Sequence, residues 1–415
     1  MPSSVKRVFT NIGELATATG SAAAAGRAQG AIVTLHHAWL LEEDGVIAAC
    51  GEGEPPKADD TVDCRGKLMT AGLVDCHTHL VFGGWREHEL AMKLAGKSYL
   101  EILAAGGGIL STVRETRAAS EDALFEKARD LYLEMRAHGT TAVEVKSGYG
   151  LDLETEQKQL RVARRLREEF GDVAATFLGA HAFPEGMDHE AYVELLCSEM
   201  IPAIAEEGLA DFVDAFCDEG VFTAEQSERV LNAGKRFGMI PKLHADEIRE
   251  IGGTQTAARV GAISCDHLSE TGADGVKALR DGGVIAVMLP ATSFYLRKPY
   301  GDFRGMIDAG VPVAVATDMN PGSTPNLSLP FAMTAGCLYG QLTPAEILTA
   351  ATLNGAAAIG MAETLGTLEP GKQADLVVWD ADNLDQLIYR YGTNRAAAVF
   401  KKGVRVTGKE TLWND

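Results

Sequence analysis

The central part of the chain alternates between amphipathic helical segments and short, almost purely apolar segments. Helical patterns over Ser120–His138 and Asp152–Phe170 each stop at a glycine, and apolar runs follow them at Thr141–Lys146 and Ala174–Gly179. The same order of helix, glycine and apolar run continues as far as residue 317. This rhythm is typical of a parallel sheet whose helices cover its faces.

The rhythm predicts eight parallel strands. Eight strands within about 290 residues favour a (β/α)8 barrel of the TIM type over the alternative, an open doubly wound sheet. An open sheet that binds nucleotides would carry a GxGxxG or P-loop motif after a strand, and no predicted strand is followed by one. The predicted strands end near Asp75, Lys146, Gly179, Phe216, Leu243, Cys265, Leu289 and Thr317.

The two ends of the chain show a different sequence pattern from the centre. Short β-rich segments separated by acidic or glycine-containing turns occupy the first 68 residues, and similar segments recur around Gly371 and Gly403. We therefore predict that residues 1–68 and 361–415 pack together as one small, discontinuous β-sandwich domain. The catalytic barrel is then expected to span residues 69–360. In the terminal parts, the segments predicted as strands are Ala31–Leu35, Trp39–Leu41, Val46–Ala49, Ala374–Trp379 and Ala398–Val406.

Composition narrows the possible partners and the compartment. The 415 residues carry a formal charge of −20, which argues against a nucleic-acid partner because phosphate binding needs a basic face. No apolar run of about 18 residues suggests a membrane span, and we see no signal peptide. Seven cysteines without a CxxC pair are predicted to be free, mostly buried thiols in a reducing compartment. The expectation is a cytoplasmic protein that acts on a small molecule.

Metal-ligating side chains follow three of the predicted strands. His77 and His79 are two residues apart after the first strand, so both imidazoles can point the same way. His244 ends the fifth strand and Asp318 follows the eighth. Three nitrogen ligands and one oxygen ligand suit a divalent metal. The simpler interpretations are polar strand-end histidines and an Asp318 that caps the following segment.

Two further polar residues lie beside this predicted metal site. Glu247 follows His244 by three residues, and His267 ends the sixth strand. A divalent metal lowers the pKa of a bound water to about 7, so a hydrolase needs groups that orient this water and move its proton. Asp318 and His267 are predicted to orient or deprotonate the water. Glu247 is predicted to carry the proton to the leaving nitrogen.

A second group of polar residues is predicted to recognise the substrate. Arg86 follows the first strand, Tyr149 the second and His181 the third. An arginine beside a phenol suits a substrate carboxylate. The alternative for Arg86 is a surface ion pair with Glu87 or Glu89.

The residues around these positions resemble the amidohydrolase superfamily and, within it, the imidazolonepropionase family of histidine degradation. The segments Ser98–Gly108 and Lys146–Asp152 are similar to that family in particular, whereas the C-terminal Gly366–Trp379 is general to the superfamily. The resemblance covers nearly the whole chain. It is carried further by Leu73-Val-Asp-Cys-His-Thr-His, Thr176-Phe-Leu-Gly-Ala-His, Leu243-His-Ala-Asp-Glu, Asp266-His-Leu and Ala316-Thr-Asp-Met-Asn-Pro-Gly-Ser.

The resemblance implies hydrolytic opening of the ring of 4-imidazolone-5-propanoate to give N-formimidoyl-L-glutamate. It implies zinc or iron held by the three histidines and Asp318 named above. It also implies a set of substrate-binding residues, which are Arg86, Tyr149, His181, Glu247, Asn320, Gly322 and Ser323.

The resemblance also bears on metal number and assembly. Superfamily members with two metals carry a bridging modified lysine on the fourth strand, whereas Lys146 here falls on the second predicted strand. We therefore expect one metal per chain, and a homodimer. Two alternatives remain: a nucleobase deaminase of the same barrel class, which would share the metal-ligand residues, and a non-catalytic scaffold of the kind in which superfamily relatives have lost their ligands.

Overall fold

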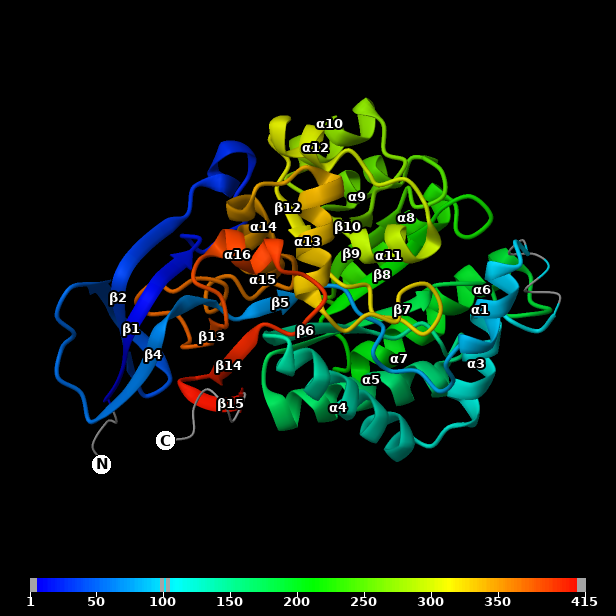
Figure 1. Cartoon of the computed structure of the whole chain (residues 1–415). Helices are drawn as coiled ribbons and strands as arrows, with labels where there is room; N and C mark the ends of the chain where they lie inside the picture. Colours follow the sequence, from blue (N-terminus) through cyan, green and yellow to red (C-terminus); the bar gives the residue numbers. More distant parts are fainter. Residues whose placement is uncertain (1–5, 98–100, 102–104, 409–415) are drawn as a thin grey trace.

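A computed structural model describes residues 6–97, 101 and 105–408 of the chain. It contains one eight-stranded sheet and one seven-stranded sheet, which we call the barrel sheet and the outer sheet. The outer sheet lies to one side of the barrel and contains the parts of the chain nearest both termini (Figure 1). The predicted fold class is confirmed.

Eight strands in chain order form the barrel sheet, and every neighbouring pair within it is parallel. An additional parallel bridge joins Thr78 to Met319, next to the first and last of these strands, so the barrel is closed. Each predicted strand end lies within two residues of the observed one. The strands are β5 (Leu73–Asp75), β6 (Thr140–Lys146), β7 (Val173–Ala180), β8 (Phe212–Cys217), β9 (Ile240–Ala245), β10 (Ser264–His267), β11 (Ile285–Met288) and β12 (Val313–Val315).

The helices between these strands begin where the sequence provides a cap. The side chain of Ser120 accepts a hydrogen bond at the start of α4, and that of Asp152 does so at the start of α5. After α4 the chain turns at Gly139, whose φ is +103°, a conformation that favours glycine. Because Gly139 has no side chain, the ring of Trp379 can pack against its backbone. A larger residue there would collide with a fully buried tryptophan of the outer sheet.

The longer helices surround the barrel, and shorter ones lie in its loops (Figure 1). The helices of the first half are α1 (Leu90–Leu94), α3 (Ile109–Ala118), α4 (Glu121–Ala137), α5 (Leu153–Phe170), α6 (His189–Leu195), α7 (Ile201–Glu206) and α8 (Ala224–Arg236). Those of the second half are α9 (Gly253–Val260), α10 (Ala273–Gly282), α11 (Pro290–Leu296), α12 (Phe303–Asp308), α13 (Leu329–Gly340), α14 (Pro344–Ala351), α15 (Leu353–Ala358) and α16 (Leu384–Tyr389).

The outer sheet joins the two ends of the chain in the order β15-β14-β13-β4-β1-β2-β3. Its central contact is the antiparallel pair of β13 and β4, which brings Leu376 opposite Ala71. Two segments predicted as separate strands, Ala31–Leu35 and Trp39–Leu41, belong to one continuous strand, β2, which begins at Val33. The strands are β1 (Lys6–Thr17), β2 (Val33–Glu43), β3 (Val46–Glu52), β4 (Asp60–Ala71), β13 (Leu376–Trp379), β14 (Ala396–Lys401) and β15 (Val404–Gly408).

Each sheet has its own apolar core. Phe9 of β1 packs edge-on against Phe400 of β14 with ring centroids 4.9 Å apart, which ties the N-terminal half of the outer sheet to its C-terminal half. The cysteines are free thiols, as predicted, and four of the seven are buried. Within the described residues, no helix is both long and apolar enough to cross a membrane.

Candidate metal centre and active site

Three strand ends bring the four predicted metal ligands together at one end of the barrel. His77 and His79 follow β5, His244 lies on β9, and Asp318 follows β12. All four side chains are almost completely buried. Strands that are far apart in sequence thus converge at their carboxyl ends, where barrel enzymes carry their chemistry.

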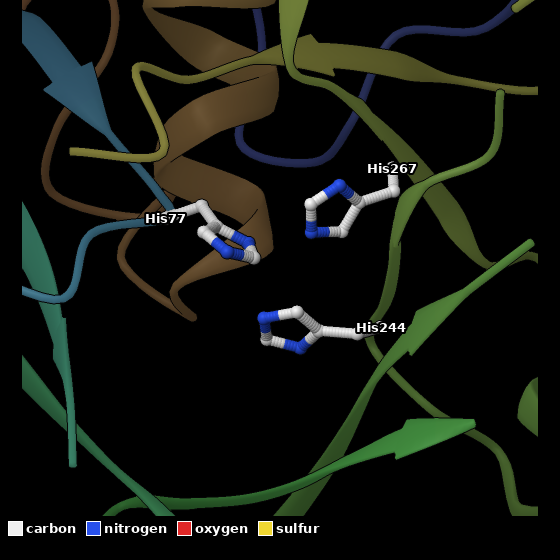
Figure 2. A group of neighbouring side chains, drawn as sticks. All are labelled: His77, His244 and His267. Carbon is white, nitrogen blue, oxygen red and sulfur yellow. The ribbon is translucent and has the colours of Figure 1, made fainter. Parts of the chain in front are cut away.

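The ligand atoms of these residues lie within reach of a common ion. The carboxylate oxygen Oδ1 of Asp318 is 3.5 Å from Nε2 of His77 and 3.6 Å from Nε2 of His79. A ligand atom from each of His77, His79 and Asp318 lies within 4.8 Å of the other two. The same holds for His77, His244 and His267, whose three rings face one another in Figure 2.

The chemistry of these atoms fits a divalent metal. Nε2 of His77 and Nε2 of His244 are buried and have no hydrogen-bond partner among the described residues. Buried polar atoms without partners are rare, and a bound cation would satisfy them. Burial, together with neighbouring positive charges, holds the pKa of His77 and the pKa of His79 well below the ordinary histidine range. Both rings are therefore neutral, as metal ligands must be.

Two carboxylates that the sequence analysis did not select lie behind the ligands. Oδ2 of Asp266 is 2.6 Å from Nδ1 of His77, and Oδ2 of Asp214 is 3.0 Å from Nδ1 of His244. A carboxylate on the outer nitrogen fixes the tautomer of a ligating histidine and raises its basicity. Both residues lie in buried strands, and an isolated aspartate in the apolar strand β8 was the one available signal for Asp214.

Asp318 is held by its own set of contacts. Thr292, in the first turn of α11, donates to Oδ2 of Asp318 at 2.7 Å. Asn320 donates to Oδ1 at 3.1 Å. The backbone of Asp318 adopts the left-handed conformation, with φ = +53°, which aspartate takes more readily than most residues. Burial raises the pKa of the Asp318 carboxyl, and the charge of His267 opposes that shift.

His267 and Glu247 lie together beside the ligands, as expected. Nδ1 of His267 is 3.6 Å from Oε2 of Glu247, and the ring of His267 is 5.2 Å from that of His244. Lys298 approaches Glu247 from outside, with its Nζ 3.6 Å from Oε1. Burial alone would raise the pKa of Glu247, but the charges of His267 and Lys298 outweigh it and lower that pKa.

Arg86 lies against the turn that follows Asp318 and is not an exposed ion pair. A side chain at Gly322 would overlap the Arg86 guanidinium, with the added carbon 1.0 Å from a terminal nitrogen. The Arg86 side chain is 12% exposed, and its Nε is 3.8 Å from the buried Glu89. The turn itself is closed by Asn320, whose Oδ1 accepts from the backbone N–H groups of Gly322 and Ser323.

Tyr149 and His181 lie beside the ligand His79. His181 stacks on His79 with ring centroids 4.9 Å apart, and the Tyr149 ring is 5.4 Å from that of His181. Nδ1 of His181 is 3.1 Å from the carbonyl oxygen of Gly148, and burial lowers the pKa of His181 to about 3. The neutral ring therefore donates from Nδ1 and leaves its Nε2 lone pair free to accept.

Two residues of α5 that the sequence analysis missed shape the Tyr149 loop. The buried carboxylate of Glu156 accepts backbone N–H groups from Gly148, Gly150 and Leu151. Gln159 accepts from the backbone of Tyr149 and donates to the carbonyl of Val81. Of the family-specific segment Ser98–Gly108, residues 98–100 and 102–104 lie outside the described residues.

Comparison with known proteins identifies the family of the chain. A family model described as the amidohydrolase family matches residues 68–406. The imidazolonepropionase of Geobacillus kaustophilus is 50% identical over 376 residues, which cover 88% of each chain. The imidazolonepropionase of Treponema denticola is 49% identical and covers 90% of this chain and 93% of its own.

Solved structures share the fold at much lower identity. A 5-methylcytosine deaminase from Klebsiella pneumoniae superposes with a TM-score of 0.74 at 17% identity, over 97% of this chain and 98% of that chain. A zinc-bound adenosine deaminase from Xanthomonas campestris gives 0.68 at 20%, over 99% and 94%. These likenesses concern the fold, whereas the sequence relatives define a narrower group. The chain belongs to the amidohydrolase family and, within it, to the imidazolonepropionases.

Proposed function

We propose that the chain hydrolyses the cyclic amide C–N bond of 4-imidazolone-5-propanoate to N-formimidoyl-L-glutamate, a step of histidine degradation. The observation that carries the proposal is a single buried mouth that combines four convergent metal-ligand side chains with an arginine held beside them. Relatives about half identical over nearly the whole chain support it. The substrate has a ring amide to cleave and a carboxylate to bind, and this mouth has groups for each.

His77, His79, His244 and Asp318 are proposed to hold one divalent ion, zinc or iron. Such an ion lowers the pKa of a bound water to about 7 and polarises the carbonyl under attack. A single ion is favoured because the Lys146 ammonium is paired with buried carboxylates and because strand β8 offers no lysine. The chain is further proposed to act in the cytoplasm as a homodimer, which light scattering would measure.

The proton movements are assigned to the three groups beside the ligands. Asp318 and His267 orient the attacking water and take its proton as the oxygen bonds to the carbonyl carbon. Glu247, in contact with His267, receives this proton and passes it to the ring nitrogen as the C–N bond breaks. The lowered pKa of Glu247 means that this carboxylate is ionised before the reaction and is able to accept the proton that it later gives.

Substrate binding is assigned to the groups around the ligands. Arg86 is proposed to pair with the propanoate carboxylate, because a guanidinium offers two parallel donors to it. Tyr149 and His181 are proposed to contact the planar ring, and Nε2 of His181 is free to accept from a ring N–H. The turn residues Asn320, Gly322 and Ser323 complete the pocket beside Arg86.

The direct test is loss of imidazolone propanoate, followed spectrophotometrically with metal-replete protein. Asp318→Asn is expected to lower kcat by about 10³-fold or more, because it removes a ligand and a proton acceptor together. Its melting temperature is expected to stay close to that of the parent, since an amide fits the same space. An Asp318→Asn protein with near-normal turnover would contradict the assignment of Asp318.

Arg86→Ala tests the carboxylate contact separately from the chemistry. It is expected to raise KM by about 10–100-fold with a smaller change in kcat, because a charge-assisted bidentate contact is lost. Lys57→Ala, an exposed cation of the outer sheet region, serves as a matched control for loss of one positive charge. An unchanged KM in Arg86→Ala would place the carboxylate elsewhere.

The alternative is a deaminase, because solved deaminases share the fold. A nucleobase has no carboxylate for Arg86, so the residues here favour the ring-opening reaction. Release of ammonia from cytosine or guanine, with no turnover of imidazolone propanoate, would favour the alternative.

A further inference from the structure

Five charged side chains are buried directly beneath the proposed metal site. Glu144 and Lys146 lie on β6, Asp214 on β8, Lys242 on β9 and Asp266 on β10, and none has measurable exposure. Buried charges are costly unless they are paired and hydrogen-bonded. The proposed reaction uses neither lysine, so the presence of both at this depth needs an explanation.

The ammonium group of Lys146 contacts three of these carboxylates. Its Nζ is 2.8 Å from Oε1 of Glu144, 2.8 Å from Oδ2 of Asp214 and 3.6 Å from Oδ2 of Asp266. Lys146 therefore bridges strands β8 and β10 from its place on β6. It lies at the centre of the cluster.

The two aspartate oxygens that face Lys146 are the same atoms that face the metal ligands. Oδ2 of Asp214 is 3.0 Å from Nδ1 of His244, and Oδ2 of Asp266 is 2.6 Å from Nδ1 of His77. Each oxygen thus lies between the ammonium group and one imidazole. Loss of the ammonium group would leave Oδ2 of each aspartate without this cation, whereas Oδ1 of Asp214 would still accept from the backbone of Ala215 and His244, and Oδ1 of Asp266 from Ser264.

We propose that Lys146 is a positioning residue of the metal centre. Its ammonium group holds Asp214 and Asp266 against the outer nitrogens of His244 and His77, so that both rings present Nε2 to the ion. The inference rests on the proposed metal site. Lys146 touches neither the ion nor the substrate, and it acts through two carboxylates on two of the four ligands.

Lys242 offers a matched control within the same cluster. Its Nζ is 2.7 Å from Oε2 of Glu144 and 3.2 Å from the carbonyl oxygens of Cys76 and Ala358. Its ion pair in the described part of the chain is with Glu144, and its charge acts on Asp266 only from beyond ion-pair distance. Lys242→Met removes a buried ammonium of the same kind without removing the bridge.

The experiment measures Zn²⁺ affinity of the metal-free full chain by competition with a chromophoric chelator. Lys146→Met keeps the length and apolar stem of the side chain and removes the charge. It is expected to weaken Zn²⁺ binding by about 10–100-fold, the usual effect of losing a group behind a metal ligand. Lys242→Met is expected to change it by less than about threefold. The visible spectrum of the Co²⁺-substituted protein should change in Lys146→Met alone.

Lys146→Arg separates charge from packing. If the charge of Lys146 is needed, Lys146→Arg should bind Zn²⁺ more tightly than Lys146→Met. If only the volume of the side chain matters, Lys146→Met should bind Zn²⁺ more tightly than Lys146→Arg, because Met is smaller. A folded Lys146→Met protein with parental Zn²⁺ affinity and Co²⁺ spectrum would overturn the proposal. So would equal loss of folding in Lys146→Met and Lys242→Met, with or without Zn²⁺, which would assign both lysines to stability alone.

Failure of the proposed metal site is distinguishable from failure of this inference. A parent protein that binds neither Zn²⁺ nor Co²⁺ would remove the metal site and the positioning role together. If the parent binds both ions and Lys146→Met binds them equally tightly, the metal site stands and only the role of Lys146 is removed.

Discussion

Gly322 decides where the Arg86 guanidinium can lie. A methyl group at Gly322 would overlap three guanidinium atoms at 1.0 to 2.1 Å, so Gly322→Ala must displace Arg86. The displacement is expected to raise KM for imidazolone propanoate by about tenfold or more, with a smaller effect on kcat, because a misplaced guanidinium loses its bidentate geometry. Steady-state kinetics beside a thermal melt would measure both effects.

Gly30→Ala is the control for this substitution. A carbon added at Gly30 would come no closer than 3.4 Å to another residue, which is ordinary contact, and Gly30 lies far from the site in the chain. Unchanged KM is expected. A Gly322→Ala protein that keeps the parental KM would show that substrate binding does not depend on the position of the Arg86 guanidinium against Gly322.

Single residues also show what sequence can and cannot reveal. His77 and His79 were predictable because a spacing of two places both side chains on one side of a strand. Asp214 and Asp266 were not selected, because their role depends on the imidazole that each one contacts: His244 on the neighbouring strand β9 for Asp214, and His77 across the barrel for Asp266. The distance between each aspartate and its imidazole is set by the register of the barrel strands, which pairs Asp266 with His244, and by the closure of the barrel.

At the scale of elements, the first turn of α5 organises the loop that carries Tyr149. Oε2 of Glu156 accepts from Gly148 at 2.9 Å, and Oε1 accepts from Gly150 and Leu151 at 2.7 and 2.9 Å. Glu156→Gln would set an NH₂ group against one of these donors. A fall in kcat/KM of about tenfold is expected, because a buried hydrogen bond to a charged acceptor is worth about 1.5–3 kcal/mol.

Glu154→Gln tests whether this effect is specific to the loop. Glu154 lies on the same turn of α5 but is exposed, so its loss of charge should leave kcat/KM unchanged. If kcat/KM falls by a similar factor in Glu156→Gln and Glu154→Gln, the effect comes from the negative charge at the start of α5 and not from the hydrogen bonds to the loop.

Elements of the barrel were predictable and those of the outer sheet were less so. Barrel strands are short apolar runs bounded by glycine and helix caps, which mark both ends. Strands β1 and β4 were not predicted, because they mix polar and apolar residues and one face of each is partly exposed. Their pairing is non-local, since β4 joins β13 about 300 residues later in the chain.

At the scale of the molecule, Lys401 links the outer sheet to the barrel. Its buried Nζ donates to the carbonyl of Thr141 at 2.9 Å and pairs with Asp172 at 2.5 Å and Asp375 at 3.1 Å. Thr141 and Asp172 belong to the barrel side and Asp375 to the outer sheet side. The proposed domain limits at residues 68 and 361 separate these groups, so the contact is between the two proposed domains.

Lys401→Met would leave two carboxylates without their shared cation. A loss of about 3–5 kcal/mol in the free energy of unfolding is expected at pH 7, as for other broken buried pairs. Arg165→Met, which removes a partly exposed cation paired with Glu121 and Asp122, is expected to cost less than about 1 kcal/mol. Urea unfolding of the three proteins measures both values.

The difference in unfolding free energy between the parent and Lys401→Met should change with pH in a defined direction. Burial alone would raise the pKa of Asp172, but the charge of Lys401 and its hydrogen bond outweigh it and lower that pKa. A carboxylate whose pKa is lower in the folded chain stabilises fully above its unfolded pKa of about 3.9 and loses that contribution as the pH falls. The gap between parent and Lys401→Met should therefore be constant from about pH 5 to 8 and shrink below about pH 4. A gap that grows on acidification would mean that Asp172 is not stabilised by Lys401.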